Sequence, residues 1–436
     1  MSGPLLGCIA DDYTGATDLS SMLVRAGLRV IQCFGTPDAN AKYGDADAVV
    51  VSLKSRSIPA DEAVSMSFDA LRFLRSIETQ RYFFKYCSTF DSTPAGNIGP
   101  VADALADELD ASQVIFCPAF PENGRTVYCG HLFVGGVPLH ESSMRNHPLN
   151  PMTDSDLVRV LQAQSKRKVE RLSLGNPQRD ESGCHLIADS INEDDLKRVA
   201  EFSREHRLLT GGSAIARYWA EALLPNQSRR SIEAETNEDC ADNLGSDAAE
   251  QSTAKAANSQ TRSVVLAGSC SDATRNQISE FAATFPVMNV DLSLTSIDDS
   301  ASLALDWCDQ QWHQSDESEK LILISSGANT EVVEAARRRW GDQEAANRVE
   351  QIFALIAKGL VERGVGRIVV AGGETSGAVI NSLGIDAVRI GREIAPGVPW
   401  VEAIGLSQGG HPLSLALKSG NFGGPRFFFD ALECEP

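Results

Sequence analysis

The most informative stretch of the chain, residues 5–18, reads LLGCIADDYTGATD. Its apolar first part, Leu5–Ile9, predicts a buried strand, and two neighbouring carboxylates, Asp11 and Asp12, follow that strand. Ligands of open α/β sheets bind at the carboxyl ends of the strands, so we expect both carboxylates to face a crevice and not the core. One of them could instead cap a helix, but two neighbouring side chains cannot both cap the same helix end.

A helix is predicted after this strand. Gly15 lets the backbone turn tightly, and Thr14 and Thr17 can each cap a helix that begins at Asp18 and ends near Ala26. The order of strand, polar loop and helix is typical of an α/β domain.

Length and composition indicate a globular protein of two domains. The chain has 436 residues, which is too long for one ordinary core. Its hydrophobic share of 42% and charged share of 22% are those of soluble proteins. We expect no membrane partner, because no apolar run approaches the roughly 20 residues that span a bilayer.

Charge and cysteine usage narrow the class further. The formal net charge of −20 argues against a nucleic-acid partner. The ten cysteines form no Cys-x-x-Cys pair, which favours reduced, mostly buried thiols over disulfides or zinc ligands. The first residues have neither a basic start nor a long apolar segment, so we expect a cytoplasmic protein.

Short apolar runs that alternate with helical patterns predict the fold class. The runs that we interpret as strands are residues 5–9, 29–34, 48–53, 82–87, 113–117, 263–268, 287–290, 320–325 and 367–370. Such alternation is typical of mainly parallel sheets covered on both faces. Residues 126–134 are expected to form a hairpin or to leave the sheet. The prediction is an α/β protein with two α/β domains, mainly parallel sheets and the active site in the interdomain cleft.

An acidic segment separates the two halves. Residues 233–250 contain seven acidic side chains, no Lys or Arg, and one large aliphatic residue. Such a segment cannot bury enough apolar surface to offset its ordering entropy, so we expect a mobile linker or surface insertion. The predicted domains are residues 1–225 and 263–436, joined by residues 226–262.

Charged and polar residues cluster just past the strand ends of the first half. They are Asp11, Asp12, Arg56, Lys85, Ser88 and Asp91. An arginine can hold a carboxylate in a bidentate fork, and carboxylates can hold or deprotonate hydroxyls. The set suits a small hydroxylated acid. The spacing of His131, His140 and His147 supports no metal site, and the metal ligands stay unknown.

The second half has three glycine-containing loops, residues 268–274, 372–378 and 418–424. The first two each open a helix, and free N–H groups at a helix N-terminus attract phosphate. None of the loops is a Walker A motif or a Gly-x-Gly-x-x-Gly fingerprint, and small residues also serve as ordinary tight turns. One domain for an anionic polyol and another for a nucleotide together suggest a kinase.

Three stretches, residues 10–16, 372–377 and 417–423, together resemble the four-carbon acid sugar kinase family, and the resemblance runs nearly end to end. Within the family, the 3-oxo-tetronate kinases are the group that the chain looks most like. The stretches that carry this likeness are residues 85–93, 96–100, 118–126 and 147–154.

The resemblance implies a sugar-acid domain followed by an ATP domain. It implies substrate contacts at Asp12, Arg56, Lys85, Tyr86, Cys87 and Ser88. It implies ATP contacts at Ser269 or Ser271, Gly372, Gly373, Glu374, Thr375 and Gly420. Which of the two serines contacts ATP stays open, and Mg²⁺ is expected to bridge the nucleotide phosphates.

The expected reaction is ATP-dependent phosphorylation of the terminal C4 hydroxyl of a four-carbon 3-oxo sugar acid, 3-oxo-tetronate, to its 4-phosphate. Asp12 would orient or deprotonate that hydroxyl, and Asp11 and Asp91 are the other candidates for the role. Two alternatives stay open: a threonate or erythronate kinase of the same family, and a non-catalytic sensor of a sugar acid and a nucleotide. The oligomeric state also stays open, a homo-oligomer included.

Overall fold

A computed structural model of the chain divides into two compact units, Met1–Gly245 and Ser246–Pro436. The structure describes residues 3–38, 41, 43, 45–146, 150–173, 183–224, 262–292, 296–313, 321–326, 330–408 and 410–436. The acidic segment, residues 226–262, lies outside the described residues apart from Arg262, which begins a strand. The predicted boundaries of this segment therefore stay predictions.

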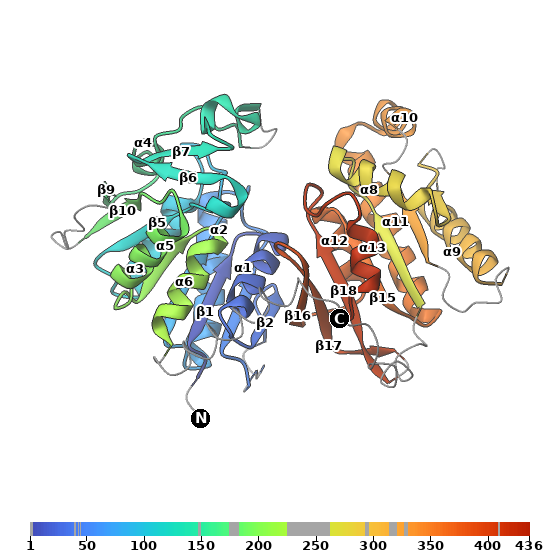
Figure 1. The fold of residues 1–436 in the computed structure, drawn as a ribbon, viewed down its shortest axis with the longest axis horizontal. Helices are drawn as coiled ribbons and strands as arrows, with labels where there is room; N and C mark the ends of the chain where they lie inside the picture. The colour runs from blue at the N-terminus through green and yellow to red at the C-terminus, as the bar shows by residue number, and fades with distance from the viewer. Residues whose placement is uncertain are drawn as a thin grey trace, which may run out of the picture. The chain divides into compact units, whose positions relative to one another are not determined.

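The N-terminal unit is built on a parallel sheet (Figure 1). In the described part of the unit its strands run in the order β2-β3-β1-β4-β11-β5-β10-β9, and every neighbouring pair is parallel. Their bounds are β1 Leu6–Ala10, β2 Val30–Phe34, β3 Ala48–Ser52, β4 Arg81–Lys85, β5 Val114–Cys117, β9 Lys168–Leu172, β10 Cys184–Ala188 and β11 Leu208–Gly211. β1, β3 and β10 are buried throughout, as strands covered on both faces must be.

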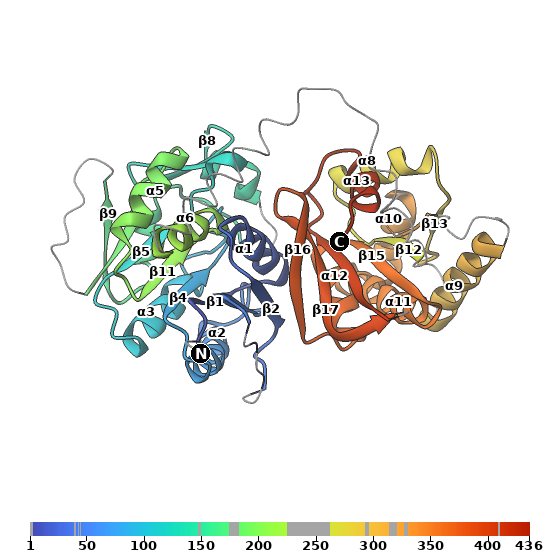
Figure 2. The same ribbon diagram turned by 60° about the horizontal axis from the view of Figure 1, so that its bottom comes forward.

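Helices cover both faces of this sheet (Figure 2). On one face α1 packs against α6 and α6 against α5, and on the other α2 packs against α3. The bounds are α1 Tyr13–Arg25, α2 Ala60–Ser76, α3 Ile98–Glu108, α4 Leu157–Gln162, α5 Glu193–Phe202 and α6 Ser213–Leu223. α1 buries Leu19, Met22 and Leu23, whose spacing places them on one side of the helix.

The segment after β5 leaves the sheet. β6 Arg125–Tyr128 and β7 His131–Val134 pair antiparallel, and β8 Val137–Pro138 adds a short third strand. The hairpin predicted in this region is therefore confirmed.

The C-terminal unit has a mixed sheet, ordered β13-β14-β12-β15-β18-β17-β16 in the described residues. The first five strands are parallel, whereas β17 pairs antiparallel with both β18 and β16. Their bounds are β12 Arg262–Ala267, β13 Val287–Asn289, β14 Ile322–Ser325, β15 Val365–Ala371, β16 Ala387–Ala395, β17 Val398–Gln408 and β18 His411–Lys418. The predicted mainly parallel α/β class is confirmed for the described sheets, but the sequence pattern does not predict the antiparallel strands β16 and β17.

Helices also cover the sheet of the C-terminal unit. α11 packs against α9, α10 and α12, and α8 packs against α13. The bounds are α8 Asp272–Ala282, α9 Ile297–His313, α10 Thr330–Trp340, α11 Asp342–Glu362, α12 Gly373–Ser382 and α13 Phe427–Glu433. Trp400 of β17 and the aromatic rings of Phe281, Phe427 and Phe428 form part of the buried core. None of the helices in the described ranges is long and apolar enough to cross a membrane.

Candidate active site

The carboxyl ends of β1, β3 and β4 meet at one edge of the N-terminal sheet. In the parallel register, Ala10 at the end of β1 lies opposite Ser52 of β3 and Lys85 of β4. The residues that follow these strand ends are therefore neighbours, although they are up to 75 positions apart in the chain. This is the edge at which the sequence predicts a sugar-acid site.

At this edge of the sheet, Arg56 forms ion pairs with Asp11 and Asp12. The Nε and Nη2 atoms of Arg56 donate to the two carboxylate oxygens of Asp11, at 2.9 and 2.7 Å. Nη2 also donates to Oδ1 of Asp12 at 2.5 Å. Within the described residues, Nη1 makes no hydrogen bond. The fork that the sequence assigns to a substrate carboxylate is thus engaged by Asp11, and Nη1 is the part of the guanidinium left for a ligand.

Asp12 caps α1, and the predicted helix start is wrong. The helix begins at Tyr13 and not at Asp18, because the Asp12 side chain accepts hydrogen bonds from the Gly15 N–H at 3.1 Å and the Thr14 hydroxyl at 2.9 Å. Burial alone would raise the pKa of Asp12, but the charges of Arg56 and Lys85 and these hydrogen bonds together lower it. Asp12 therefore stays ionised at a lower pH than an ordinary aspartate does.

The backbone of Asp11 fastens the loop that carries Arg56. Its carbonyl accepts from the N–H groups of Ser55 and Arg56 at 2.9 and 3.2 Å, and its own N–H donates to the Lys85 carbonyl at 3.1 Å. Burial raises the pKa of the Asp11 carboxyl, although the charge of Arg56 acts in the opposite direction. Burial opposes the charge on Arg56 as well, yet Asp11 and Asp12 hold the pKa of its guanidinium well above the usual value.

Lys85 places a second cation beside the pair. It is 3% exposed, and its ammonium donates to the Tyr86 carbonyl at 3.0 Å. A Cβ on Gly15 would lie 3.2 Å from this ammonium and 2.1 Å from Oδ1 of Asp12. Gly15 therefore matters because it leaves room for these charged groups, not only because it permits a turn. The cluster consists of Asp11, Asp12, Arg56 and Lys85, two anions and two cations.

The other predicted substrate residues, Tyr86, Cys87 and Ser88, differ in whether their side chains are exposed to a ligand. The ring of Tyr86 is completely buried and packs against Phe90 and Phe116, so its side chain belongs to the core and only its backbone could meet a ligand. Cys87 is partly exposed, and its Sγ lies 3.0 Å from the Thr89 hydroxyl. Ser88 is also partly exposed.

Asp91, the third candidate for the catalytic carboxylate, lies six positions after the end of β4. Its side chain is 7% exposed. The carboxylates of Asp11 and Asp12 both contact the Arg56 guanidinium. The choice among the three carboxylates stays a prediction.

Asn97 was not singled out from the sequence as a site residue. Its amide is buried and donates to the carbonyls of Ser55, Arg56 and Ile58 at 2.7, 3.4 and 3.1 Å. It therefore positions the loop that carries Arg56. Its position just before α3 was the sequence signal that could have drawn attention to Asn97. The three carbonyls to which it donates lie about 40 positions earlier in the chain.

In the C-terminal unit the three glycine-containing loops converge, as three neighbouring parallel strands end together. Ala267 of β12 lies opposite Ala371 of β15, and Ala371 lies opposite Lys418 of β18. The N–H groups of Gly268 and Ser269 both donate to the Ala371 carbonyl at 3.0 Å, and that of Gly372 donates to the Lys418 carbonyl at 2.9 Å.

The loops are packed so closely that side chains are excluded from two glycines. A Cβ on Gly268 would lie 2.0 Å from Oγ1 of Thr375, and a Cβ on Gly420 would lie 2.3 Å from Oγ of Ser269. Such distances do not occur between real atoms without a shift of one of them. The loops therefore pack closely against one another at these glycines. Glycine backbone without a side chain is also what lets a loop approach a phosphate.

The two serines of the first loop differ in their hydrogen bonds. The Ser271 hydroxyl caps α8, accepting from the Thr274 N–H at 3.2 Å, and donates to the Gly420 carbonyl at 2.6 Å. The Ser269 hydroxyl accepts from the Ser271 N–H at 3.2 Å, and in the part of the chain that the structure describes it donates to no acceptor. Ser269 is therefore the serine with capacity for a ligand.

The second loop opens α12. Gly372 is its N-cap with φ 129°, a conformation that favours glycine, whereas Gly373 is the first helical residue and is exposed. Glu374 is exposed in the first turn, and Thr375 is buried. The α12 N-terminus has no side-chain cap, so its N–H groups are available to an anion.

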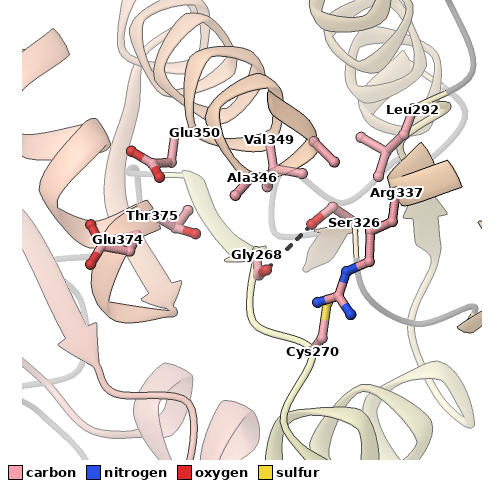
Figure 3. A pocket seen from close by; sticks show the side chains of 11 residues that line it. Gly268, Cys270, Leu292, Ser326, Arg337, Ala346, Val349, Glu350, Glu374 and Thr375 are labelled. Atoms are coloured by element: carbon pink, nitrogen blue, oxygen red, sulfur yellow. Dashed lines mark hydrogen bonds between the residues drawn. The ribbon is translucent and has the colours of Figure 1, made fainter. Parts of the chain in front are cut away.

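A pocket adjoins these loops (Figure 3). Its lining consists of Gly268, Cys270, Leu292, Ser326, Arg337, Ala345, Ala346, Val349, Glu350, Glu374 and Thr375. Ala346 and Val349 of α11 project into it above Gly268, and Glu350 and Glu374 lie to one side. An apolar wall with a few polar groups, next to the glycine-containing loops, fits a nucleoside with its phosphates. In the described residues no three His, Cys, Asp or Glu side chains converge to hold a metal ion.

Comparisons with known proteins agree with this division of sites. Family models for a sugar-binding N-terminal domain and a nucleotide-binding C-terminal domain match residues 6–219 and 264–428. The chain is 45% identical to the 3-oxo-tetronate kinase of Cupriavidus necator, over 98% of this chain and 96% of that protein. It is 44% identical to the 3-oxo-tetronate kinase of Burkholderia multivorans, over 99% and 97%.

Two solved structures have the same fold across their length. A protein of Salmonella typhimurium LT2 is 38% identical with a TM-score of 0.81, over 98% of both chains. A protein of Haemophilus influenzae is 34% identical with a TM-score of 0.76, over 98% of this chain and 99% of the other. The protein is therefore a kinase, and it belongs to the four-carbon acid sugar kinase family.

Proposed function

We propose that this kinase transfers the γ-phosphoryl group of ATP to the C4 hydroxyl of a four-carbon 3-oxo sugar acid, 3-oxo-tetronate. The observation that carries the proposal is the cluster of Asp11, Asp12, Arg56 and Lys85 at the carboxyl ends of β1, β3 and β4. This cluster brings together two cations that can bind the carboxylate of a substrate and an ionised carboxylate of the protein that can hold a substrate hydroxyl. The names of the relatives support the same substrate class.

The sugar acid would be held by its carboxylate. Arg56 would contribute Nη1, since Nε and Nη2 are engaged by Asp11 and Asp12. Lys85 would add positive charge from the neighbouring strand end. Ser88 and the Lys85–Cys87 backbone would contact the hydroxyls and the keto oxygen, because they are the polar groups next to these cations along the chain.

Asp12 would hold the attacking hydroxyl. Its lowered pKa keeps it ionised near neutral pH, so it can accept a hydrogen bond from that hydroxyl and receive the proton late in the transfer. Asp11 would keep Arg56 in place, because both of its carboxylate oxygens are occupied by the guanidinium. Phosphoryl transfer relies mainly on positioning and charge, which this division of roles provides.

The nucleotide would bind to the C-terminal unit. Ser269, Gly372, Gly373, Thr375 and Gly420 would form the phosphate cradle. Glu374 would suit ribose hydroxyls better than phosphate, since a carboxylate accepts hydrogen bonds from hydroxyls. When bound, ATP supplies the phosphoryl group, and its Mg²⁺ spreads the charge of the phosphates.

The test is an ATP-consumption assay over a panel of three- to six-carbon sugar acids. We expect turnover with 3-oxo-tetronate well above that with D-threonate or D-erythronate. Faster turnover of D-threonate or D-erythronate would show instead that the protein is a threonate or erythronate kinase of the same family. Binding of a sugar acid and ATP without turnover on any member of the panel would favour a sensor.

A further inference from the structure

Lys418 is a buried cation that the substrate assignments leave unused. It is the last residue of β18 and its side chain is 0% exposed. Its ammonium donates to Oγ1 of Thr274 at 3.1 Å and to the carbonyls of Ser419 and Gly420 at 3.0 Å each. All three partners are neutral, and in the described ranges no carboxylate lies within ion-pair distance of the ammonium. Burying an ammonium without a counter-charge is unfavourable, so an anion is expected to supply that charge.

The carbonyl of Gly420 is held in place by hydrogen bonds, one of them from the Lys418 ammonium. It accepts from three donors: the Lys418 ammonium at 3.0 Å, the Ser271 hydroxyl at 2.6 Å and the Thr274 hydroxyl at 2.8 Å. These bonds hold the carbonyl oxygen, which would repel phosphate, on the protein side of the loop. The N–H groups of Gly420 and Asn421 donate to no acceptor among the described residues. Successive free N–H groups form an anion-binding nest.

Beyond its neutral partners, two helix N-termini and two acidic side chains of their first turns lie around the loop that Lys418 precedes. α8 and α12 both begin beside this loop, and helix N-termini carry partial positive charge. Asp272 of α8 is engaged by Arg275, and Glu374 of α12 is exposed. The ring of Phe427 lies 5.8 Å from the ammonium on its remaining side.

We propose that Lys418 is a positioning residue for the nucleotide phosphates: it balances their charge from behind the Ser419–Asn421 loop and holds the loop carbonyls away from them. The inference rests on the proposed function and deepens it. It implies that affinity gained from each phosphate depends on Lys418, whereas affinity for the nucleoside does not.

Calorimetric titration of adenosine, ADP and ATP into the full chain tests this. Lys418→Met should weaken ATP binding by about 10- to 100-fold, the loss expected for a charge-assisted contact, and leave adenosine nearly unchanged. Lys358→Met is the matched control, because it removes the same charge from an exposed position of α11 and should change neither affinity. An equal loss for adenosine and ATP would show a structural role only and overturn the inference.

Proton uptake gives a second readout that a structural role would not move. Burial lowers the pKa of Lys418 to about 8. A bound anion favours the protonated ammonium, so wild-type protein at pH 8 to 8.5 should take up protons as ATP binds. The uptake is measured by calorimetry in two buffers of different ionisation enthalpy, and Lys418→Met should abolish it.

Thr274→Val keeps the inference testable if Lys418→Met fails to fold. This substitution leaves the charge of Lys418 in place but removes one hydrogen-bond partner of its ammonium. ATP binding should therefore weaken while proton uptake persists. Wild-type protein that binds ATP without proton uptake would overturn the inference and leave the proposed function intact. Wild-type protein that binds no nucleotide would overturn both.

Discussion

Arg56 holds both carboxylate oxygens of Asp11, through Nε at 2.9 Å and Nη2 at 2.7 Å. The pair joins the end of β1 to the loop after β3. The side chain of Asp11 is only 4% exposed, whereas that of Arg56 is 22% exposed. The guanidinium therefore joins these two segments through Nε and Nη2, whereas Nη1 makes no hydrogen bond among the described residues.

Arg56→Ala should raise KM for the sugar acid far more than KM for ATP, because only the acid loses a cation. It should also lower stability by up to about 3 kcal/mol, because Asp11 and Asp12 lose their counter-charge. Steady-state kinetics and denaturant unfolding measure the two effects. The double variant Arg56→Ala/Asp11→Asn should recover part of the stability and none of the acid affinity. Equal rises in both KM values would count against the assignment.

Asp12→Asn should keep the cap of α1, since asparagine is also a good N-cap, but remove the charge that holds the hydroxyl. We expect kcat to fall by roughly 10²- to 10⁴-fold with little change in KM for ATP. Asp11→Asn is the comparison, and its effect on kcat should be smaller. Wild-type kcat in Asp12→Asn together with an inactive Asp11→Asn or Asp91→Asn would give the role to another carboxylate.

Gly420→Ala should weaken nucleotide binding by about tenfold or more, because its Cβ would lie 2.3 Å from Oγ of Ser269 and displace that hydroxyl from the proposed phosphate site. Binding of the sugar acid, followed by thermal shift, should be unchanged. Gly424→Ala is the matched control four residues later, where a Cβ meets nothing within 4 Å. Unchanged ATP affinity in Gly420→Ala would place the phosphates elsewhere.

Asn97→Asp should loosen the loop that carries Arg56, because a carboxylate oxygen replaces the donor that faces three carbonyls. The expected loss is about 1 to 3 kcal/mol of stability, with a higher KM for the sugar acid and an unchanged KM for ATP. Asn381→Asp, at an exposed position of α12, is the control for the change in charge. A stable Asn97→Asp variant with normal kinetics would remove Asn97 from the positioning network.

Many parallel strands of both sheets could be predicted because a short apolar run, such as Leu5–Ile9, is flanked by polar residues and followed by a helical pattern. β18, which is parallel to β15, was not predicted. The antiparallel strands β16 and β17 could not be predicted. They include partly exposed residues such as Arg389, Glu393 and Gln408, and no helical pattern separates them. Strands of this kind lack the continuous apolar signal of a strand covered on both faces.

The site was predictable to the level of strand ends, but not to the level of hydrogen bonds. The sequence indicates that Asp11, Asp12 and Arg56 share one edge, yet it cannot show that Asp11 engages the Arg56 fork. The start of α1 was misplaced because Asp12 caps the helix and not Thr14 or Thr17. Lys418 was not selected, because a lysine after three apolar residues gives no sign that its ammonium is buried.

The phosphorus NMR spectrum of the product formed from ATP and 3-oxo-tetronate tests whether the C4 hydroxyl is the one phosphorylated. We expect one phosphomonoester signal, split by the two protons of C4, that grows in step with ADP. A signal split by the single C2 proton, or release of inorganic phosphate without any sugar phosphate, would contradict it.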